Sequence, residues 1–593
     1  MDEKGLGLFN GKDMPNVEWG WENYEKSVAY NTRLNLPDTV KTNENFYVGK
    51  QWEGVVANGM PTPQYNFLKR VTGHTVASIL GDDVRLMASP LEAAPNEDGR
   101  IDSVRIINEE VVRIMKQVRF SRLQKIFCRD AAVRGDACTY TWFDADAPAG
   151  NGVKGRIRTE IVKNTRMFFG NPSDSTVQTQ PWIMMERREM LRDARKKAKE
   201  NGIENWNDIQ PDDGINMDSV DQVKRLDGQV TCVTLMWKND DGIVWAYEFT
   251  EKVELRKPYN TRLRLYPITW LSWDYVDDSY HGQAMLTGLI PNQVFVNKMW
   301  AMSSLNMYRA GIGKYVYDKT KIAHIDNRIG AAIPVQGPVE GAIKIIDPVP
   351  IHPQVFQYIE AAITLTQETL GATEAALGEG KAYNTSAILS LQKASATPHA
   401  VTQQNIYDQD EDQGRIWLEF MTMYYGERTV DMPITDEMRA MLEQANELAM
   451  AAGEQPQDIP EMVPVEFDFR TLKDHEYNIR IDAGGSSYYS EIASLQTLDN
   501  LLLNGFITPI QYLERIPDGN ITGRRQLIEE LKADMKKQEE MQMQQLQQQM
   551  GAMPGPEQAA PGGTGEIAET DAREEQRSTG FRELGEALRA IGG

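Results

Sequence analysis

Two apolar stretches, residues 291–310 and 353–370, constrain the fold most, because each is long enough for a helix of about 30 Å. Each begins with a proline, whose missing N–H costs nothing in a first helical turn. Each is followed by a glycine, Gly311 or Gly371, which suits the left-handed end of a helix. The pattern therefore predicts two long helices. Their apolar positions are Val294, Val296, Met299, Met302, Leu305 and Met307 on the first, and Phe356, Ile359, Ile363 and Leu370 on the second.

The segments next to these helices are short and are interrupted by glycine and proline. Residues 311–350 hold three short runs of β-forming residues, which predict a small αβ insertion between the two helices. A glycine-rich loop, 372–383, follows the second helix. Another long helical pattern then runs over 384–425, and Pro398 inside it should bend that helix.

The chain before these helices contains both helical and strand patterns. A helical period runs over 103–134, and residues 137–144 then alternate as a strand. The runs 230–238 and 243–253 predict a hairpin. We therefore expect an α+β fold with several domains.

The two ends of the chain differ from its middle. Residues 1–40 are polar and expected to be loosely ordered, apart from Trp19, Trp21 and Tyr24, which fit either a short docking helix or a frayed helical end. Residues 467–481 predict a strand, with helical patterns up to 541. Beyond 542 the composition is typical of a linker. A final apolar stripe then needs cover from the protein's own body or from a partner groove. It consists of Phe581, Leu584, Leu588 and Ile591.

The chain is acidic, with a net charge of −23 over 593 residues. This charge argues against a protein that coats DNA by neutralising phosphates, although DNA can still slide past an acidic surface. The three cysteines are far apart, so neither a disulfide framework nor a zinc site is expected and a reducing compartment fits. No run of about eighteen apolar residues occurs, so we expect no membrane span, and the acidic N-terminus predicts no signal peptide.

Motifs for catalysis and for cofactor or metal binding are incomplete. Gly380-Lys381 lacks both the first glycine and the Ser/Thr of a phosphate-binding P-loop. His475-Glu476 lacks the second histidine of an H-E-x-x-H zinc site. We therefore expect no cofactor and no metal site. The many acidic residues leave a carboxylate nuclease open, but the missing constellation favours a structural protein over an enzyme.

A basic cluster over residues 187–199 has two interpretations. It forms either a solvated helix face or a patch that meets DNA or an acidic partner. The sequence leaves both open. The cluster consists of Arg187, Arg188, Arg192, Arg195, Lys196, Lys197 and Lys199.

Several short motifs follow one another in a characteristic order over residues 40–535. They are NFYVGKQW (45–52) with Pro61 and Asn66, DAAVRGDA (130–137), NP (171–172), YHGQ (280–283), NQ (292–293), NK (297–298), YNTSA (383–387) and LLLNGFIT (501–508). In this order they resemble the portal proteins of tailed double-stranded DNA bacteriophages. Each motif is short, and their shared order carries the resemblance.

The resemblance implies a ring of about twelve subunits at one vertex of the capsid, with DNA passing through its centre. Each subunit would be a multi-domain α+β protein. Its parts would be an N-terminal arm (1–40), a wing (41–288 and 384–466), two stem helices (289–310 and 351–371), a small αβ clip (311–350), a tunnel loop (372–383), a helical crown (467–541) and a flexible tail with a short terminal helix (542–593).

Two candidate sites follow from the resemblance. The tunnel loop would face the DNA channel with Gly378, Glu379, Gly380, Lys381 and Tyr383. Lys381 is either a transient phosphate contact or a simple surface lysine. The clip would dock the packaging motor and later the tail adaptor with Lys314, Tyr317, Lys319, Lys321 and Arg328. On the stem, the more polar Gln354, Thr364 and Gln367 are candidates to face the channel.

The resemblance also implies the partners and the location. The partners would be further copies of the chain, double-stranded DNA, the terminase large subunit, head–tail adaptor and tail proteins, and the major capsid and scaffold proteins, with no membrane. The protein would assemble in the host cytoplasm and reside at the portal vertex of the virion, where DNA is packaged and ejected. Two alternatives remain open: a nuclease acting on DNA, and a non-portal scaffold or adaptor protein of a virion.

Overall fold

The computed structural model divides the chain into two compact units, Met1–Asp482 and Ala483–Gly593. In the second unit, helix α13 (Pro509–Arg515) begins with a capping box at Thr508. In the first unit, helices and antiparallel sheets occur together, so the expected α+β class is confirmed. The described residues are 14–434 with gaps at 82–83, 91–97, 151–152, 215–227, 312–313, 326–331, 347–351 and 371–396, then positions within 439–446, most of 460–482, and 498, 501–503, 506–516 and single positions up to 537.

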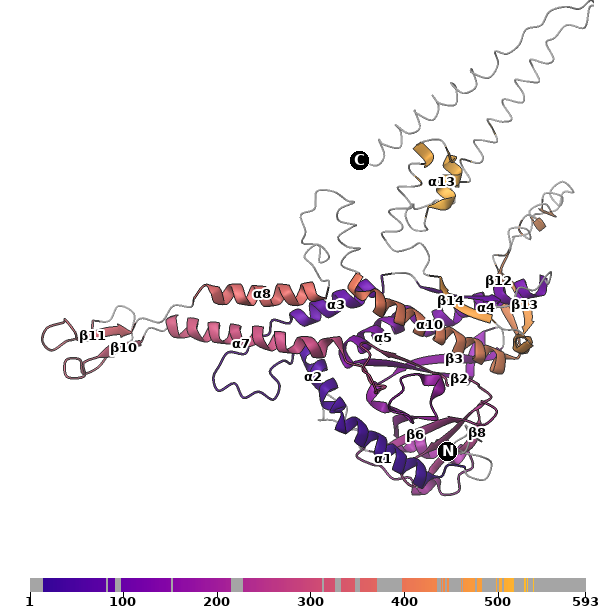
Figure 1. Cartoon of the computed structure of the whole chain (residues 1–593), viewed down its shortest axis with the longest axis horizontal. Coiled ribbons are helices and arrows are strands. Elements are labelled where there is room, and N and C mark those ends of the chain that lie inside the picture. The colour runs from indigo at the N-terminus through magenta and orange to yellow at the C-terminus, as the bar shows by residue number, and fades with distance from the viewer. Residues whose placement is uncertain are drawn as a thin grey trace, which may run out of the picture. The chain divides into compact units, whose positions relative to one another are not determined.

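A five-stranded antiparallel sheet forms one part of the first unit, and helix α1 lies against it (Figure 1). Tyr24 of α1 is buried against the sheet, and its hydroxyl donates to Glu186 Oε2 at 3.0 Å. The docking-helix interpretation is therefore confirmed, and the expectation of a loosely ordered segment is wrong for α1. The elements are α1 (Val17–Arg33), β4 (Met167–Phe169), β5 (Trp182–Met190), α6 (Leu191–Glu200), β6 (Gln229–Lys238), β7 (Val244–Phe249) and β8 (Glu254–Asn260).

A three-stranded sheet, in the order β3-β2-β9, packs against helix α10. Amide and hydroxyl groups connect them: Gln409 Nε2 donates to Thr269 Oγ1 at 2.7 Å, and Gln413 Nε2 donates to Thr141 Oγ1 at 2.9 Å. The predicted strand 137–144 is confirmed as part of β2. The elements are β2 (Asp136–Gly150), β3 (Val153–Val162), β9 (Ile268–Ser272) and α10 (Ala400–Phe420).

Two small sheets join segments that are far apart in the sequence. Strand β1 pairs with β14, and β12 pairs with β13, both antiparallel. Residues 467–482 therefore lie in the first unit, whereas the sequence interpretation gave them to the crown. We accordingly move the start of the expected crown to residue 483. The elements are β1 (Arg85–Pro90), β12 (Glu427–Pro433), β13 (Met462–Asp468) and β14 (Tyr477–Asp482).

The helical period of residues 103–134 belongs to two helices, so the prediction of one uninterrupted helix is wrong. Arg119 between them has a φ of 55°, in the left-handed region. The next residue, Phe120, is buried, and its ring meets the edge of Trp417 at a centroid distance of 5.5 Å. The break lets α4 lie beside β1 while α5 lies beside β2. The two helices are α4 (Asp98–Val118) and α5 (Phe120–Arg134).

Helices α2, α3 and α5 share one apolar core with the start of α7. Helix α7 begins six residues before Pro291, so the prediction that the proline opens this helix is wrong. Pro291 lies on the exposed side of α7, where water can bond the carbonyl that the proline leaves unpaired. The elements are α2 (Leu36–Val48), α3 (Phe67–Ile79) and α7 (Met285–Gly311).

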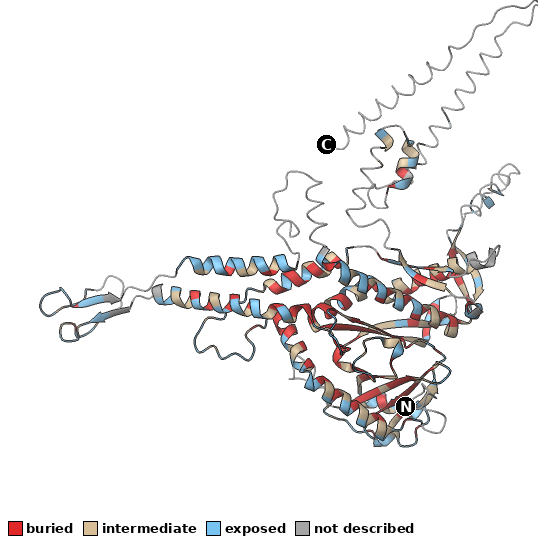
Figure 2. Cartoon of the chain, viewed as in Figure 1, coloured by how far each residue is buried: buried red, intermediate tan, exposed pale blue. Residues whose placement is uncertain are grey.

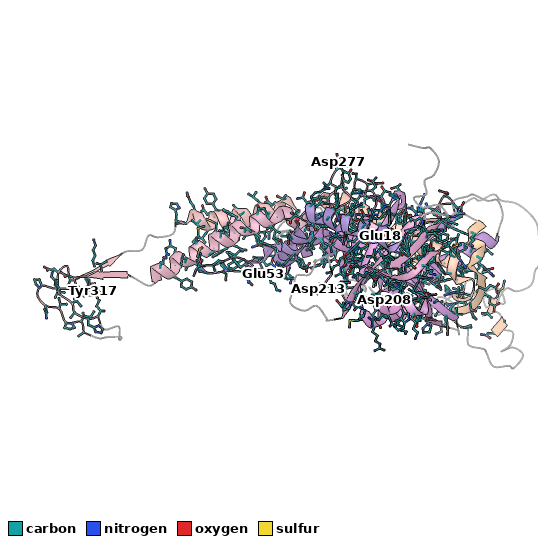
Figure 3. The ribbon with its side chains drawn as sticks, turned by 90° about the horizontal axis from the view of Figure 1, so that it is seen from below. Glu18, Glu53, Asp208, Asp213, Asp277 and Tyr317 are labelled. Atoms are coloured by element: carbon teal, nitrogen blue, oxygen red, sulfur yellow. The ribbon has the colours of Figure 1, made fainter. Side chains whose placement is uncertain are left out.

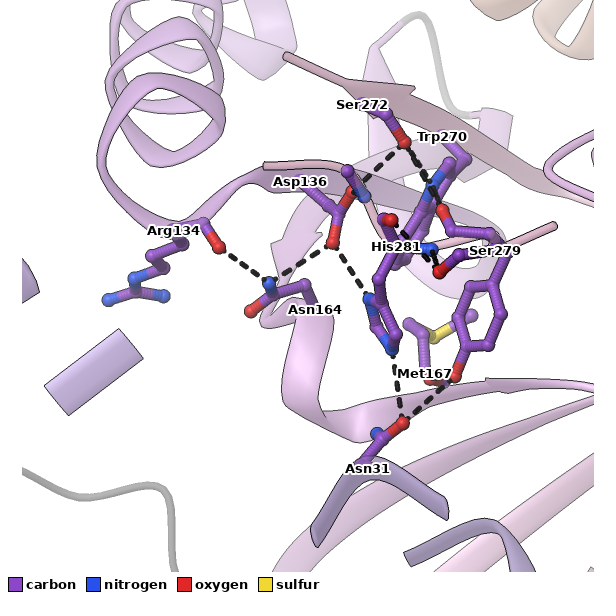
Figure 4. A network of polar contacts seen from close by, with 11 residues as sticks. Asn31, Arg134, Asp136, Asn164, Met167, Trp270, Ser272, Ser279 and His281 are labelled. Carbon is purple, nitrogen blue, oxygen red and sulfur yellow. Dashed lines mark hydrogen bonds and ion pairs between the residues drawn. The ribbon is translucent and has the colours of Figure 1, made fainter. Parts of the chain in front are cut away.

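A buried polar network holds the segment before α7 against the sheets (Figure 4). Asp136, at the start of β2, accepts hydrogen bonds from Gly282 N at 2.7 Å and from Ser272 Oγ at 2.9 Å. Its other oxygen lies 2.8 Å from His281 Nδ1. The second ring nitrogen of His281 lies 3.1 Å from Asn31 Oδ1 of α1. The network thus joins α1, β2 and β9 at the base of α7.

A second buried carboxylate belongs to Asp410 of α10. Gln124 Nε2 donates to Asp410 Oδ2 at 2.6 Å. Burial raises the pKa of the Asp410 carboxyl to about 8, while this hydrogen bond acts in the opposite direction. The folded protein therefore binds a proton on the Asp410 carboxyl more tightly than the unfolded chain does, because an aspartate in an unfolded chain has a pKa of about 3.9. The resulting stabilisation is complete below that value and is lost as the pH rises through about 8.

We predict that Asp136→Ala lowers the free energy of unfolding by about 3–5 kcal/mol, because buried donors then lose their acceptor. Urea unfolding of the purified protein measures the change. Asp277→Ala is the control, because Asp277 is exposed (Figure 3) and its loss should change stability by less than about 0.5 kcal/mol. Equal effects of the two substitutions would contradict the role given to the network.

We predict that Asp410→Asn raises stability by several kcal/mol at about pH 9 and has little effect at about pH 4. The asparagine keeps an oxygen that accepts from Gln124 but carries no buried charge. Asp408→Asn, two residues away on the exposed side of α10, should leave the pH dependence unchanged. Thermal unfolding across this pH range compares the variants, and equal slopes for Asp410→Asn and the parent would refute the assignment.

Candidate functional site

Helices α7 and α8 (Gln354–Thr369) run side by side and antiparallel (Figure 1). Asn292 Nδ2 donates to Thr366 Oγ1 at 3.0 Å, and the rings of Trp300 and Phe356 meet at a centroid distance of 5.9 Å. These two contacts fix the register of the pair. Helix α8 begins directly after Pro353, as the sequence predicts.

Helix α8 meets α7 along one narrow stripe, and most of its surface is exposed (Figure 2). Ile359 and Thr366 are its buried residues. Tyr358 and Leu365, by contrast, are 63% and 62% exposed. With the exposed Ala361 between them they share one side of the helix, and we call these three residues the α8 flank. An exposed apolar strip of this kind marks a surface that associates with another molecule.

The side of α8 opposite α7 is polar and carries no basic residue. Two of its four residues are acidic, so it presents negative charge. Of the residues expected to face a channel, Gln354 and Thr364 are exposed and Gln367 is half-buried. The polar side consists of Gln357, Glu360, Thr364 and Glu368.

Helix α7 also leaves a stripe uncovered. Phe295 and Met302 are exposed, with the exposed Lys298 between them. The apolar surface predicted for this helix is therefore divided, because Val296 is fully buried whereas Met302 is not. The α8 flank escaped the sequence interpretation, although the seven-residue spacing of Tyr358 and Leu365 is a signal that could have found it.

Strands β10 (Lys314–Tyr317) and β11 (Ile343–Ile346) pair antiparallel at the end of α7 and α8 that lies away from the sheets (Figures 1 and 3). The exposed Val316 and Val339 leave apolar surface there. Beyond Gly311, the last residue of α7, no helix occurs in the part of 312–350 that the structure describes, and residues 332–335 form no strand. The expected αβ character is therefore not found in those residues, and Pro334 removes a donor that a strand would need.

The candidate docking residues separate into two groups. Lys314 and Tyr317 are the first and last residues of β10. Lys319 is exposed, and Lys321 Nζ lies 3.4 Å from the carbonyl oxygen of Glu340. These four positions therefore belong to the paired strands and the turn after β10. Arg328 lies outside the described residues.

The expected tunnel-loop residues lie within 371–396, outside the described residues. The residues on either side of this segment meet, because His399 Nε2 donates to the carbonyl oxygen of Leu370 at 2.8 Å. Burial lowers the pKa of His399, while this hydrogen bond acts in the opposite direction. Pro398 lies in a 3-10 turn that precedes α10, so it does not bend the described helix. The tunnel-loop residues that lie outside the described residues are Gly378, Glu379, Gly380, Lys381 and Tyr383.

The basic cluster of residues 187–199 has partners within the chain. Arg188 pairs with Asp212, and Arg195 Nη2 donates to the carbonyl oxygen of Ile209 at 2.7 Å. Lys197 pairs with Glu248. For these three side chains neither sequence interpretation is adequate, because their acceptors come from residues that the local pattern does not contain.

Cys128, Cys138 and Cys232 are unpaired and buried, and burial raises the pKa of the Cys128 thiol to about 12. Across the described ranges, no three His, Cys, Asp or Glu side chains are grouped so that they could hold a metal ion. Among the same residues, no helix has the length and apolar character that crossing a membrane requires.

Comparison with known proteins agrees with the resemblance found in the sequence. The phage P22-like portal protein family matches residues 177–577, more than half of the chain, and the match includes α7 and α8. No curated protein matches the chain. Portal proteins are in general structural components of the virion that assemble as rings and contact phage head and tail proteins. The chain therefore belongs to the phage P22-like portal protein family.

Proposed function

We propose that this protein forms a ring at one capsid vertex, that the ring is the channel for DNA packaging and ejection, and that it docks the packaging motor and then the tail. The observation that carries this proposal is the division of α8 into three sides. One side contacts α7, a second side is apolar and exposed, and a third side is polar and acidic. In a single chain the apolar side stays in contact with water, which is unfavourable, whereas a ring of such chains would bury it between neighbouring copies.

The polar side of α8 suits the wall of a DNA channel. It carries Glu360 and Glu368 and no basic residue. Each lysine or arginine that contacts phosphate would release counterions and tighten binding. A wall without such residues holds DNA weakly, which supports a role in letting DNA slide.

We further infer that β10, β11 and the turn after β10 form the clip. Exposed apolar and basic side chains there, such as Val316, Tyr317 and Lys319, suit contact with a protein partner. The proposed partners are the terminase large subunit during packaging and the head–tail adaptor afterwards. The sheets and helices outside the stem would form the wing, which contacts capsid and scaffold proteins, and residues from 483 would form the crown.

We predict that the purified protein assembles into rings and that the pair Tyr358→Glu and Leu365→Glu weakens assembly by about a hundredfold or more. Two apolar side chains would lose their burial and two charges would be buried in their place. Mass photometry over a concentration series and averaged electron micrographs measure assembly.

A matched control lies on the same helix. Gln357→Glu and Thr364→Glu add the same charge one residue earlier in each case, on the polar side, so rings should persist. Monomers of the parent protein at all concentrations would contradict the proposed ring. Loss of rings in the control would contradict the assignment of the sides of α8.

We predict that Gly378→Pro with Gly380→Pro leaves the ring intact and reduces DNA packaging by about tenfold or more, because proline removes the freedom of a tunnel loop to change shape. The amount of DNA packaged by procapsids that carry the variant measures the effect. Gly378→Ala with Gly380→Ala restricts the backbone less and should package more DNA than the proline pair. Normal packaging by the proline pair would remove the tunnel-loop assignment.

A further inference from the structure

The connection between α2 and α3, residues 49–66, presents apolar side chains from a built scaffold; we call it the α2–α3 loop. Its base is attached to α7: Asn297 Nδ2 donates to Gln51 Oε1 and Gln293 Nε2 donates to the carbonyl oxygen of Tyr65, both at 2.6 Å. Trp52 Nε1 donates to the carbonyl oxygen of Pro63 at 2.8 Å and closes the loop. These contacts hold the tip of the loop in a defined place beside α7.

The tip of the loop is apolar and uncharged. Val55, Val56 and Met60 are exposed, Val56 to 80%. Residues 54–66 contain no charged side chain, in a chain of which 25% of the residues are charged. Such a tip gives no attraction to phosphate or to a charged surface, and it gains most from contact with an apolar surface.

The α8 flank is an apolar surface at the same height along the helix pair. Asn292 lies beside Thr366, and Trp300 lies beside Phe356. The contacts of the loop with α7 span positions 293–300, which this antiparallel register sets beside residues 356–365 of α8. The flank, Tyr358 to Leu365, falls within that range.

The loop and the flank lie on opposite sides of the helix pair. Successive residues of a helix are about 100° apart, so the α7 positions that meet the loop, Gln293 and Asn297, differ in direction from those that meet α8. The same spacing places Phe295 and Met302 of α7, together with the α8 flank, on the side of the helix pair that faces away from the α2–α3 loop. The described part of the chain leaves both apolar surfaces uncovered, since Val56, Tyr358 and Leu365 are each more than 60% exposed.

A closed ring requires two different complementary surfaces on each copy, and its copies are related by rotation alone. With the helix pair set along the ring axis, as the proposed ring requires, a surface meets what lies at its own height on the facing side of the next copy. We propose that the tip of the α2–α3 loop, at Val55, Val56 and Met60, packs against the α8 flank of the neighbouring copy of this chain. This contact rests on the proposed ring and names the residues that close it.

Thiol cross-linking tests where the loop lies. Val56→Cys and Leu365→Cys in one chain, treated with a short bis-maleimide, should give a ladder of covalent oligomers up to the ring. The native thiols are buried, which keeps the background low. Val316→Cys with Leu365→Cys is the control, because Val316 of β10 is also exposed but lies at a different height, and this pair should give no ladder.

A charge substitution tests whether the contact stabilises the ring. Val56→Asp should raise the protein concentration needed for half-assembly by about tenfold or more. Val401→Asp is the matched control, since Val401 is 73% exposed on α10, and it should change that concentration by less than about twofold.

The outcomes separate the two proposals. If the parent protein forms no ring, the proposed function fails. If the parent forms rings but Val56→Cys and Leu365→Cys give no ladder, or if Val56→Asp assembles as the parent does, the loop contact is wrong while the ring stands. Weaker assembly of Val56→Asp without the ladder would mean that the loop meets another surface, which also overturns this proposal.

Discussion

The narrow contact between α7 and α8 is the constraint on which the rest of the site depends. A helix packed along one stripe has about two-thirds of its circumference free, and in α8 that surface is divided between apolar and acidic sides. If α8 were buried on both flanks within its own chain, it would offer no apolar surface to a neighbouring copy. If its free surface were wholly polar, copies would have little reason to associate.

The sequence predicts those elements whose boundaries are set by local chemistry. The bounds of α8 follow from Pro353 and a narrow apolar stripe, and the hairpin of β6 and β7 follows from the turn at Gly242. Two other boundaries could not be predicted locally. Arg119 takes a left-handed conformation that the residue itself does not favour, because Phe120 packs against the distant α10. Pro291 is tolerated inside α7 because its side of the helix is exposed.

Some features of the candidate site can likewise be predicted from local sequence, and others cannot. Apolar positions on α7 and α8 can be read from helical spacing, but spacing does not say which of them a neighbouring element covers. The α2–α3 loop gives no periodic signal, and its attachment through Gln51, Gln293 and Asn297 joins residues far apart in the chain. The pairing of β1 with β14 is likewise invisible to a local pattern, so the sequence does not show that residues 477–482 belong to the first unit.

The buried network at the base of α7 has a mechanical consequence for the strands at its other end. Helix α7 has 27 residues, which corresponds to about 40 Å. A tilt of about five degrees at its base would therefore move β10 and β11 by about 3–4 Å, enough to disturb the contacts of a docking surface. Asp136 bonds the backbone of Gly282 and the side chain of Ser272 directly, so the segment leading into α7 is held by short bonds rather than by apolar packing alone. The motif 130–137 contains Asp136, and the motif 280–283 contains its partners His281 and Gly282. The network therefore gives a structural role to two motifs that carry the resemblance.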